Sequence, residues 1–243
     1  MAAPAPQIER TSATLLAFPR ARAHIGAALK LHRLPENLAA LLARESESFA
    51  EVSPYAALAY ALDQRMAPRP LDLEQANIIL LAGPSGAGKS CVGAKIAHAA
   101  AARGRKVERA RFEGAGALHA TPCPPDTLLV LEADGFNPLN KRAATAFSAL
   151  DGMPGVETLG VISALSDAED VADLVTAFRF RRVIVTNLDR TRRLGALLAA
   201  VTSGAHLAHV STGPDPATPL QTLTPGALAT KLLNTRVLDV PAH

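Results

Sequence analysis

Cysteines and long apolar runs are both scarce in this sequence. Its 243 residues include only two cysteines, Cys91 and Cys123, which are too few for a disulfide framework and indicate a reducing compartment. The opening residues MAAPAPQIER have no apolar signal-peptide core, and no apolar run approaches the ~18 residues of a membrane span. We therefore expect a cytoplasmic protein.

Concentrated charge is also lacking. The formal net charge is +3, and the Lys and Arg residues are spread along the chain instead of forming one tract. Nucleic acid is therefore not an expected partner. A basic stretch from Arg20 to Arg33, interleaved with Leu and Ile, leaves two interpretations open. It is either a solvated helix face or a surface that binds peripherally to the anionic inner membrane.

The hydrophobic content is ample for a buried core. Hydrophobic residues make up 49% of the sequence and charged residues 19%, which is typical of a globular protein. The length fits one main domain with a smaller one beside it. Residues 1–72 are predicted to form a small N-terminal helical domain, and residues 73–243 a larger α/β domain.

Helical signals fill the first of these domains. Leu38, Leu41 and Leu42 have helical spacing, and Ser53 followed by Pro54 is typical of a helix start. The buried face of the helix that begins there is predicted to consist of Tyr55, Leu58, Ala59 and Leu62.

From residue 77 onward, short apolar runs alternate with helical segments, which indicates a mostly parallel sheet with helices on both faces. Strands are predicted at 77–82, 106–112, 127–132, 156–162, 182–187 and 206–211. Helices are predicted at 89–103, 166–178, 190–203 and 225–234. The capping box Ser166-x-x-Glu169 would open the second of these helices, and Thr224 followed by Pro225 would open the last.

The segment GPSGAGKS, from Gly83 to Ser90, lies between a predicted strand and a predicted helix. Its glycines let the backbone fold into a loop whose N–H groups point at a polyphosphate. Lys89 would contact the β and γ phosphate oxygens, Ser90 would bind Mg²⁺, and the positive end of the helix would face the same anion. The alternative is a chance match in a Gly-rich loop. The strand before the motif and the helix after it favour a P-loop NTPase fold.

Seven residues of this motif, together with Cys91 directly after it, are expected to line the phosphate site: Gly83, Ser85, Gly86, Ala87, Gly88, Lys89, Ser90 and Cys91. Cys91 has two interpretations, a small buried helix residue or a reactive thiol, and the first is the commoner role.

A P-loop NTPase also needs an acidic residue at the tip of a neighbouring strand. The strand predicted at 127–132 ends in Glu132-Ala133-Asp134-Gly135. Glu132 or Asp134 is therefore the candidate catalytic group on the metal side, with Glu132 joining Ser90 as a metal ligand. Gly135 would give the backbone room near the γ-phosphate. The alternative is an ordinary acidic turn after a strand.

A third segment, Thr186-Asn187-Leu188-Asp189, follows another apolar strand and precedes a helix. A carboxylate at Asp189 can accept two hydrogen bonds from the N1 and N2 donors of guanine, which adenine lacks. The alternative is that Asp189 only caps the next helix.

The order of these segments resembles a known family. GPSGAGKS is followed by AKIAHAAAARGRKV, TNLDRTRRLGALLAAV and AHVSTG. This order is similar to that of the GTPase domain of the signal-recognition-particle family, which includes its receptor and the flagellar GTPase FlhF. The helical segment in front is similar to that family's N-terminal helical domain, so the resemblance covers most of the chain.

The resemblance implies GTP and Mg²⁺ as the cofactors. Asp189 would contact guanine beside Thr186 and Asn187, and Gly213 would lie in a closing loop near the base. Gly195 would mark the close approach of its helix to the helical domain. In this family two GTPase domains complete each other's sites, which implies a second copy or a related GTPase as partner.

The sequence also departs from the family pattern. In the family's DTAGR loop, Glu132 replaces the Asp and Phe136 replaces the Arg. Asn187 replaces the Lys of TKLD, and Pro214 replaces the Gln after Gly213. Only 14 residues, 113–126, separate two of the predicted strands where the family has a longer catalytic insertion. Weak or partner-dependent GTP hydrolysis is therefore expected.

Three functions remain open at this point. The first is a GTP-binding switch in protein targeting or flagellar placement. The second is a nucleotide-binding scaffold that does not hydrolyse, and the third is a P-loop kinase or ATPase. Arg109 and Arg111 remain near the shortened segment, but neither matches the family's catalytic loop.

Overall fold

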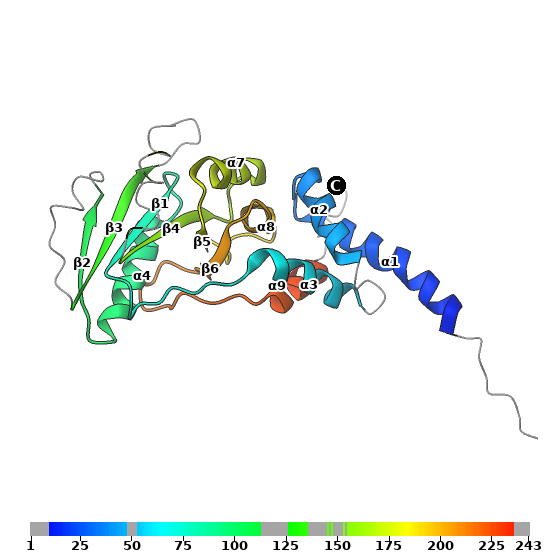
Figure 1. Cartoon of the computed structure of the whole chain (residues 1–243), viewed down its shortest axis with the longest axis horizontal. Coiled ribbons are helices and arrows are strands. Elements are labelled where there is room, and N and C mark those ends of the chain that lie inside the picture. Colours follow the sequence, from blue (N-terminus) through cyan, green and yellow to red (C-terminus); the bar gives the residue numbers. More distant parts are fainter. Residues whose placement is uncertain are drawn as a thin grey trace, which may run out of the picture.

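The structure is a computed structural model that describes residues 10–47, 53–112, 126–135, 145, 147, 153 and 155–235. For residues 10–20 and for Asp134 it describes the backbone alone. An α/β part and a group of helices lie side by side (Figure 1). None of the described helices combines the length and the apolar character that a membrane span requires.

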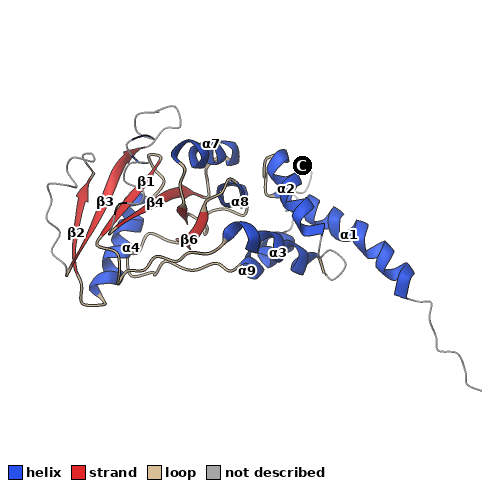
Figure 2. Cartoon of the chain, viewed as in Figure 1, coloured by secondary structure: helices blue, strands red, loops and turns tan. Residues whose placement is uncertain are grey.

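A six-stranded sheet forms the centre of the α/β part (Figure 2). Its strands are β1 (Ile78–Gly83), β2 (Lys106–Arg111), β3 (Thr127–Gly135), β4 (Val156–Ser163), β5 (Arg182–Thr186) and β6 (His206–Val210). They are all parallel, in the order β2-β3-β1-β4-β5-β6. The predicted parallel sheet is thus confirmed. β3 runs three residues further than predicted, to Gly135, and so carries Glu132 inside the strand.

Helices cover both faces of this sheet, as buried parallel strands require. α4 (Lys89–Ala101) packs on one face through an apolar cluster that includes Leu81, Ile96 and Val130. α7 (Ala168–Phe178) and α8 (Gly195–Thr202) pack on the other face, in the larger apolar cluster. The chain therefore builds two apolar layers around one sheet.

The remaining helices form a separate group that we term the helical unit. It contains α1 (Arg10–Leu31), α2 (Glu36–Ser46), α3 (Pro54–Met66) and α9 (Pro225–Asn234). α9 comes from the far end of the chain and packs against α3 and α1 (Figure 1). Both ends of the described chain therefore meet in this unit.

Two predicted helix starts are confirmed. Ser53 Oγ accepts a hydrogen bond from the Tyr55 N–H, and Thr224 Oγ1 accepts one from the Ala227 N–H. In both cases proline follows the capping residue in the first turn. This is the local arrangement that the sequence predicts, because a cap needs only neighbouring backbone N–H groups.

Three local predictions were wrong. α7 is capped by Asp167, which accepts hydrogen bonds from Glu169 and Asp170, not by Ser166. The helix predicted from residue 190 begins at Gly195, because the preceding residues form a turn. Tyr55 does not lie on the buried face of α3: it is 39% exposed, and its hydroxyl donates to Asn234 Oδ1.

The buried face of α3 instead combines two alanines with three larger apolar side chains. Its buried residues are Ala57, Leu58, Ala61, Leu62 and Met66. The predicted Ala59 is only partly buried. α3 packs against α9, a partner that the sequence of α3 alone does not reveal.

Candidate functional site

The Gly-rich segment forms a loop between the end of β1 and the start of α4. Gly86 and Gly88 have φ angles of 76° and 93°, which lie in the left-handed region that glycine adopts without strain. Gly88 is the N-cap of α4 and has no capping side chain, so the first N–H groups of the helix are not covered by one. Such a helix start attracts anions, because its backbone dipoles point their positive ends at the loop.

The tip of β3 lies against this loop. Gly135 pairs with Gly83 in the strand register. A Cβ atom on Gly135 would overlap the Ser85 side chain and would lie 3.0 Å from the Ser85 nitrogen. Glycine therefore lets β3 approach the loop closely, at the position where sequence analysis expected room near the γ-phosphate.

Lys89 folds back over the loop. Its Nζ donates hydrogen bonds to the carbonyl oxygens of Gly83 and Pro84, each at 2.9 Å. The ammonium group is thus held inside the loop by neutral acceptors. A phosphate oxygen would give it a stronger, charge-assisted hydrogen bond, so this arrangement is ready to exchange its partners for an anion.

Ser90, Glu132 and Arg109 form a connected polar group beside the loop. Ser90 Oγ donates to Glu132 Oε2 at 2.5 Å. Arg109 Nη2 donates to Glu132 Oε1 at 2.7 Å and to the Ser90 carbonyl oxygen at 3.0 Å. The structure thus brings together the two residues predicted to bind the metal and adds an arginine that was not assigned to the site.

The environment of Glu132 favours its ionised form. Burial alone would raise the pKa of Glu132, but the hydrogen bonds from Ser90 and Arg109 outweigh it. The positive charges of Arg109 and Lys89 act in the same direction, so the pKa lies below the usual carboxyl value. Glu132 is therefore a carboxylate at neutral pH.

These donors suit Mg²⁺. A hydroxyl and a carboxylate oxygen are hard ligands of the kind that Mg²⁺ prefers, usually together with water and substrate phosphates. Among the described residues, no group of three or more His, Cys, Asp or Glu side chains could hold a metal by itself. Asp134 lies in β3, but the position of its side chain is outside the described part of the chain.

A cavity of about 360 Å³ begins at the end of the phosphate loop. Its lining joins the start of α4, the end of β5 and the segment after β6: Gly88, Cys91, Thr186, Asn187, Asp189, Arg190, Ser211, Gly213 and Pro214. Every residue predicted to surround the base is in this lining. They come from three separate segments, so the fold gathers them at one place.

The end of β5 is anchored to the phosphate loop. Thr186 Oγ1 donates to the Ala87 carbonyl oxygen at 2.7 Å, and its side chain lies against Gly88. Asn187 has a left-handed φ of 59°, and its Nδ2 donates to Ser163 Oγ at 3.0 Å. The side-chain amide of Asn187 is thus tied to β4.

Asp189 is exposed at the cavity and does not cap a helix. The N-cap of α8 is Leu194, which makes no side-chain capping bond, and α8 starts six residues after Asp189. The capping interpretation is therefore contradicted. Within the described chain, the Asp189 carboxylate has no hydrogen-bond partner, which leaves both of its oxygens free to accept from a ligand.

Two side chains of α4 contact the segment after β6. Cys91 is partly buried, and its Sγ lies 3.8 Å from the Gly213 carbonyl oxygen. Lys95 is 1% exposed, and its Nζ donates to the Thr212 carbonyl oxygen at 2.6 Å. Sequence analysis missed Lys95, for which the signal was a lone lysine within the apolar run around Ile96.

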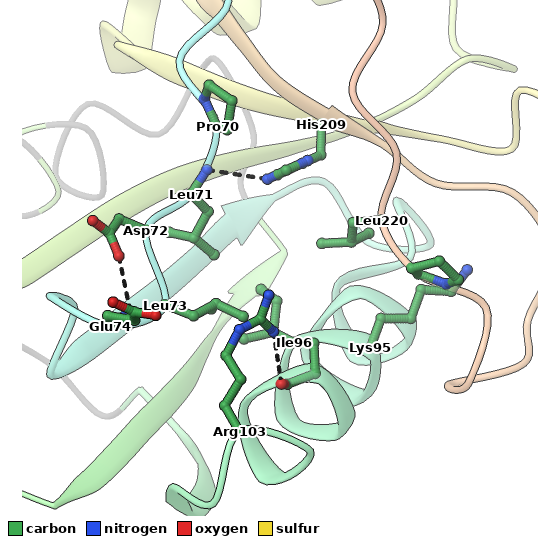
Figure 3. A pocket seen from close by; sticks show the side chains of 12 residues that line it. Pro70, Leu71, Asp72, Leu73, Glu74, Lys95, Ile96, Arg103, His209 and Leu220 are labelled. Carbon is green, nitrogen blue, oxygen red and sulfur yellow. Dashed lines mark hydrogen bonds between the residues drawn. The ribbon is translucent and has the colours of Figure 1, made fainter.

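Another cavity has none of the Gly-rich loop in its lining (Figure 3). It measures about 430 Å³ and lies between residues 70–74, α4 and residues 219–220. His209 of β6 closes one side, where its Nε2 accepts the Leu71 N–H at 3.0 Å. No residue of the Gly-rich loop lines this cavity, so its size alone does not mark the nucleotide site.

No protein-family model matches the chain, and no curated protein matches its sequence. Solved structures do match its fold. FlhF complexed with GTP/Mg²⁺ has 15% identity and a TM-score of 0.61, over 88% of this chain and 99% of that one. The cell division protein FtsY from Thermotoga maritima has 16% identity and a TM-score of 0.63, over 87% of both chains.

A third match is the 54 kDa signal recognition particle protein from Aeropyrum pernix K1 in complex with GDP. It has 18% identity and a TM-score of 0.59, over 94% of this chain and 65% of that one. Identities this low establish a shared fold. The fold that the sequence resemblance implied, including the helices in front of the sheet, is therefore confirmed.

Proposed function

We propose that this chain, which has the fold of the signal-recognition-particle GTPases, is a GTP-binding protein that uses Mg²⁺. The observation that supports this most is the cavity that starts at Gly88 and reaches Asp189. Its lining includes both the N-cap of a helix start suited to phosphate and a free carboxylate. This combination suits a nucleotide whose base offers two hydrogen-bond donors, as guanine does.

The site residues divide into three groups by role. Lys89 and the backbone of the loop would bind the phosphates. Ser90 and Glu132 would hold Mg²⁺, whose charge neutralises the triphosphate. Asp189 would select guanine, with Asn187 fixing the turn that carries it. The FlhF structure complexed with GTP/Mg²⁺ supports this choice of cofactors.

The biological role we propose is a nucleotide-dependent switch in protein targeting or flagellar placement. Its partner would be a second copy of this chain or a related GTPase, and its place would be the cytoplasm, in part at the surface of the inner membrane. The fold shared with FlhF and FtsY supports this proposal. The link between the helical unit and the GTPase part, through α9 and the turn before α8, gives such a switch a physical path.

Hydrolysis by the isolated chain is proposed to be slow. Phosphoryl transfer needs positioned charge around the γ-phosphate and an oriented water. Here Phe136 and Pro214 occupy positions where the family has Arg and Gln, and the segment between β2 and β3 is short. Residues 113–125, which make up most of that segment, lie outside the described part of the chain.

A second candidate function is a nucleotide-binding scaffold that does not hydrolyse GTP. The observation that favours it is the pairing of Glu132, whose two oxygens are occupied by Ser90 and Arg109. Each oxygen keeps a lone pair for Mg²⁺, but the two donors fix the carboxylate in one orientation, which favours a metal-binding role over a catalytic one. The two functions share the same binding site and differ only in turnover.

Binding would be tested with fluorescent N-methylanthraniloyl derivatives of GTP, GDP and ATP. We expect GTP to bind better than ATP. Alkylation of Cys91 by N-ethylmaleimide, in a Cys123→Ser background, gives an independent readout because Cys91 lines the cavity. GTP should protect Cys91 and ATP should protect it less. Equal binding and protection by ATP would favour the kinase or ATPase function.

Hydrolysis would be measured in single-turnover reactions at saturating protein. Slow GTP turnover that a partner accelerates would support the switch. The absence of turnover under every condition tested would support the scaffold. Turnover by the isolated chain near ~1 s⁻¹, the low end for competent phosphoryl-transfer enzymes, would contradict both.

A further inference from the structure

Arg109 belongs to an edge strand, yet its guanidinium group is drawn into the candidate metal site. In the register of β2 with β3, Arg109 lies opposite Val130, and Arg111 lies opposite Glu132. Arg109 nevertheless reaches along the sheet to Glu132 Oε1 and to the Ser90 carbonyl oxygen. Arg111 makes no hydrogen bond to Glu132. The ion pair therefore follows from the conformation of one side chain and not from the nearest register pair.

Helix α4 leaves room for this ion pair. Gly93 is a buried glycine inside α4, where glycine is unfavourable relative to alanine. A Cβ atom at Gly93 would lie 3.1 Å from Glu132 Oε1 and 3.5 Å from Arg109 Nε. The first distance is tighter than most side-chain contacts. Residues of three elements, α4, β2 and β3, therefore contribute to the surroundings of the Glu132 carboxylate.

We propose that Arg109 is a positioning residue that fixes Glu132 beside Ser90 and thereby sets how tightly the site holds Mg²⁺ next to the nucleotide. This inference rests on the proposed function. Ser90 Oγ keeps two lone pairs while it donates its proton to Glu132, so it could bind Mg²⁺ without losing that hydrogen bond. Arg109 is the second donor, and it holds the other carboxylate oxygen of Glu132, Oε1, in place.

Arg109 also balances charge at the site. Lys89 and Arg109 are positive and Glu132 is negative. Without Arg109, Lys89 alone of these two cations would offset the charges of Glu132 and of an incoming triphosphate. Side chains that orient metal ligands in this way typically contribute 10–100-fold to metal affinity. The residue is not part of any motif that sequence analysis assigned to nucleotide binding.

The test is a Mg²⁺ titration of chain loaded with N-methylanthraniloyl-GTP in EDTA, followed by fluorescence. For Arg109→Ala we expect the half-saturating Mg²⁺ concentration to rise by about 10–100-fold. Arg111→Ala is the matched control, since it removes the same charge from the same strand, and we expect a much smaller change. Arg109→Lys, which keeps the charge but loses the planar donor group, should fall between wild type and Arg109→Ala.

A double-mutant cycle separates positioning from general electrostatics. If Arg109 acts through Glu132, Arg109→Ala should cost almost nothing in a Glu132→Gln background. Equal effects of Arg109→Ala and Arg111→Ala, or an unchanged effect in the Glu132→Gln background, would overturn the inference. Should Arg109→Ala not fold, as judged by circular dichroism, Arg109→Lys carries the same comparison. Failure of the wild type to bind GTP in a Mg²⁺-dependent way would instead refute the proposed function.

Discussion

The two ends of the sheet differ in how much of their surface is covered. At one end, β2 is an edge strand in which every residue except the half-buried Val107 is exposed. Toward the other end, every residue of α8 is buried, between the sheet and the helical unit. The candidate metal site lies near the open end and the base cavity near the packed one. The proposed base site is thus built beside a well-buried part of the fold, while the carboxylate proposed to bind the metal depends on a few polar contacts.

The largest expected effect is at the phosphate loop between the two ends. Lys89→Ala should abolish triphosphate binding, because truncating one partner of a desolvated charge pair costs about 2–5 kcal/mol. The fold should persist, since the loop backbone remains. The control is Lys106→Ala, which removes an exposed lysine of β2 that forms an ion pair with Asp126. Wild-type affinity in a folded Lys89→Ala variant would contradict the site.

The packed end can be broken at Gly195. A Cβ atom there would overlap the His32 carbonyl oxygen and would lie 2.9 Å from that of Arg33. Because both neighbours are backbone, Gly195→Ala should lower the free energy of unfolding by about 2–3 kcal/mol in denaturant titrations. Gly26→Ala in α1 is the control, since no atom lies within 4 Å of its added Cβ. Equal stability of the two variants would show that the contact is easily relieved.

Base recognition is expected to be sensitive to a smaller change. Asp189→Asn turns two acceptors into one acceptor and one donor, so it no longer matches both guanine donors. We expect GTP affinity to fall by about 1–3 kcal/mol while ATP affinity changes little. Competition binding measures both. An equal loss for the two nucleotides would mean that Asp189 acts on the phosphates or on the fold.

The smallest expected effect is a pH dependence of stability that arises from His32, which links the helical unit to the α/β part. His32 is fully buried: Leu194 N–H donates to its Nδ1 at 3.1 Å, and its Nε2 lies 3.2 Å from the Leu232 carbonyl oxygen. Since Nδ1 accepts, the ring is neutral with its proton on Nε2. Burial lowers the pKa of His32 below 6.5, and the charges of Arg193 and Lys231 add to this.

The sign of the pH effect follows from this lowered pKa. Below pH 6.5 the unfolded chain binds a proton that the folded chain refuses, so stability falls as the pH drops toward the folded pKa. We expect a drop in the thermal midpoint of about 2–4 °C, equivalent to roughly 1 kcal/mol. His32→Gln, whose amide can both donate and accept, should lose less over the same range. An equal drop in the thermal midpoint of wild type and His32→Gln would mean that other titratable groups cause the pH dependence.

Sequence alone predicted the elements whose determinants are local. The six strands were placed within a few residues, because short apolar runs and the turns between them are local features. The caps at Ser53 and Thr224 were predicted because a cap needs only its own first turn. The phosphate loop was predicted for the same reason, since its spacing is contained in eight consecutive residues, Gly83 to Ser90.

The sequence could not choose between competing local signals or foresee distant contacts. Ser166 and Asp167 are both good capping residues, and only the path of the chain decides that Asp167 caps α7. Likewise α9 packs against α3 although all six strands of the sheet lie between them in the sequence, so its burial pattern depends on a partner that its own sequence does not specify.

The candidate site shows the same division. The sequence by itself determined which groups are candidates to bind phosphate and which carboxylates are candidates for the metal and the base, because these candidates follow from residue chemistry and motif spacing. Only the tertiary structure decided that Glu132 meets Ser90, that Arg109 joins them instead of Arg111, and that Asp189 stays free. The physical reason is that hydrogen bonds act over about 3 Å. Whether two side chains come that close depends on strand register, side-chain conformation and the glycines that give them room.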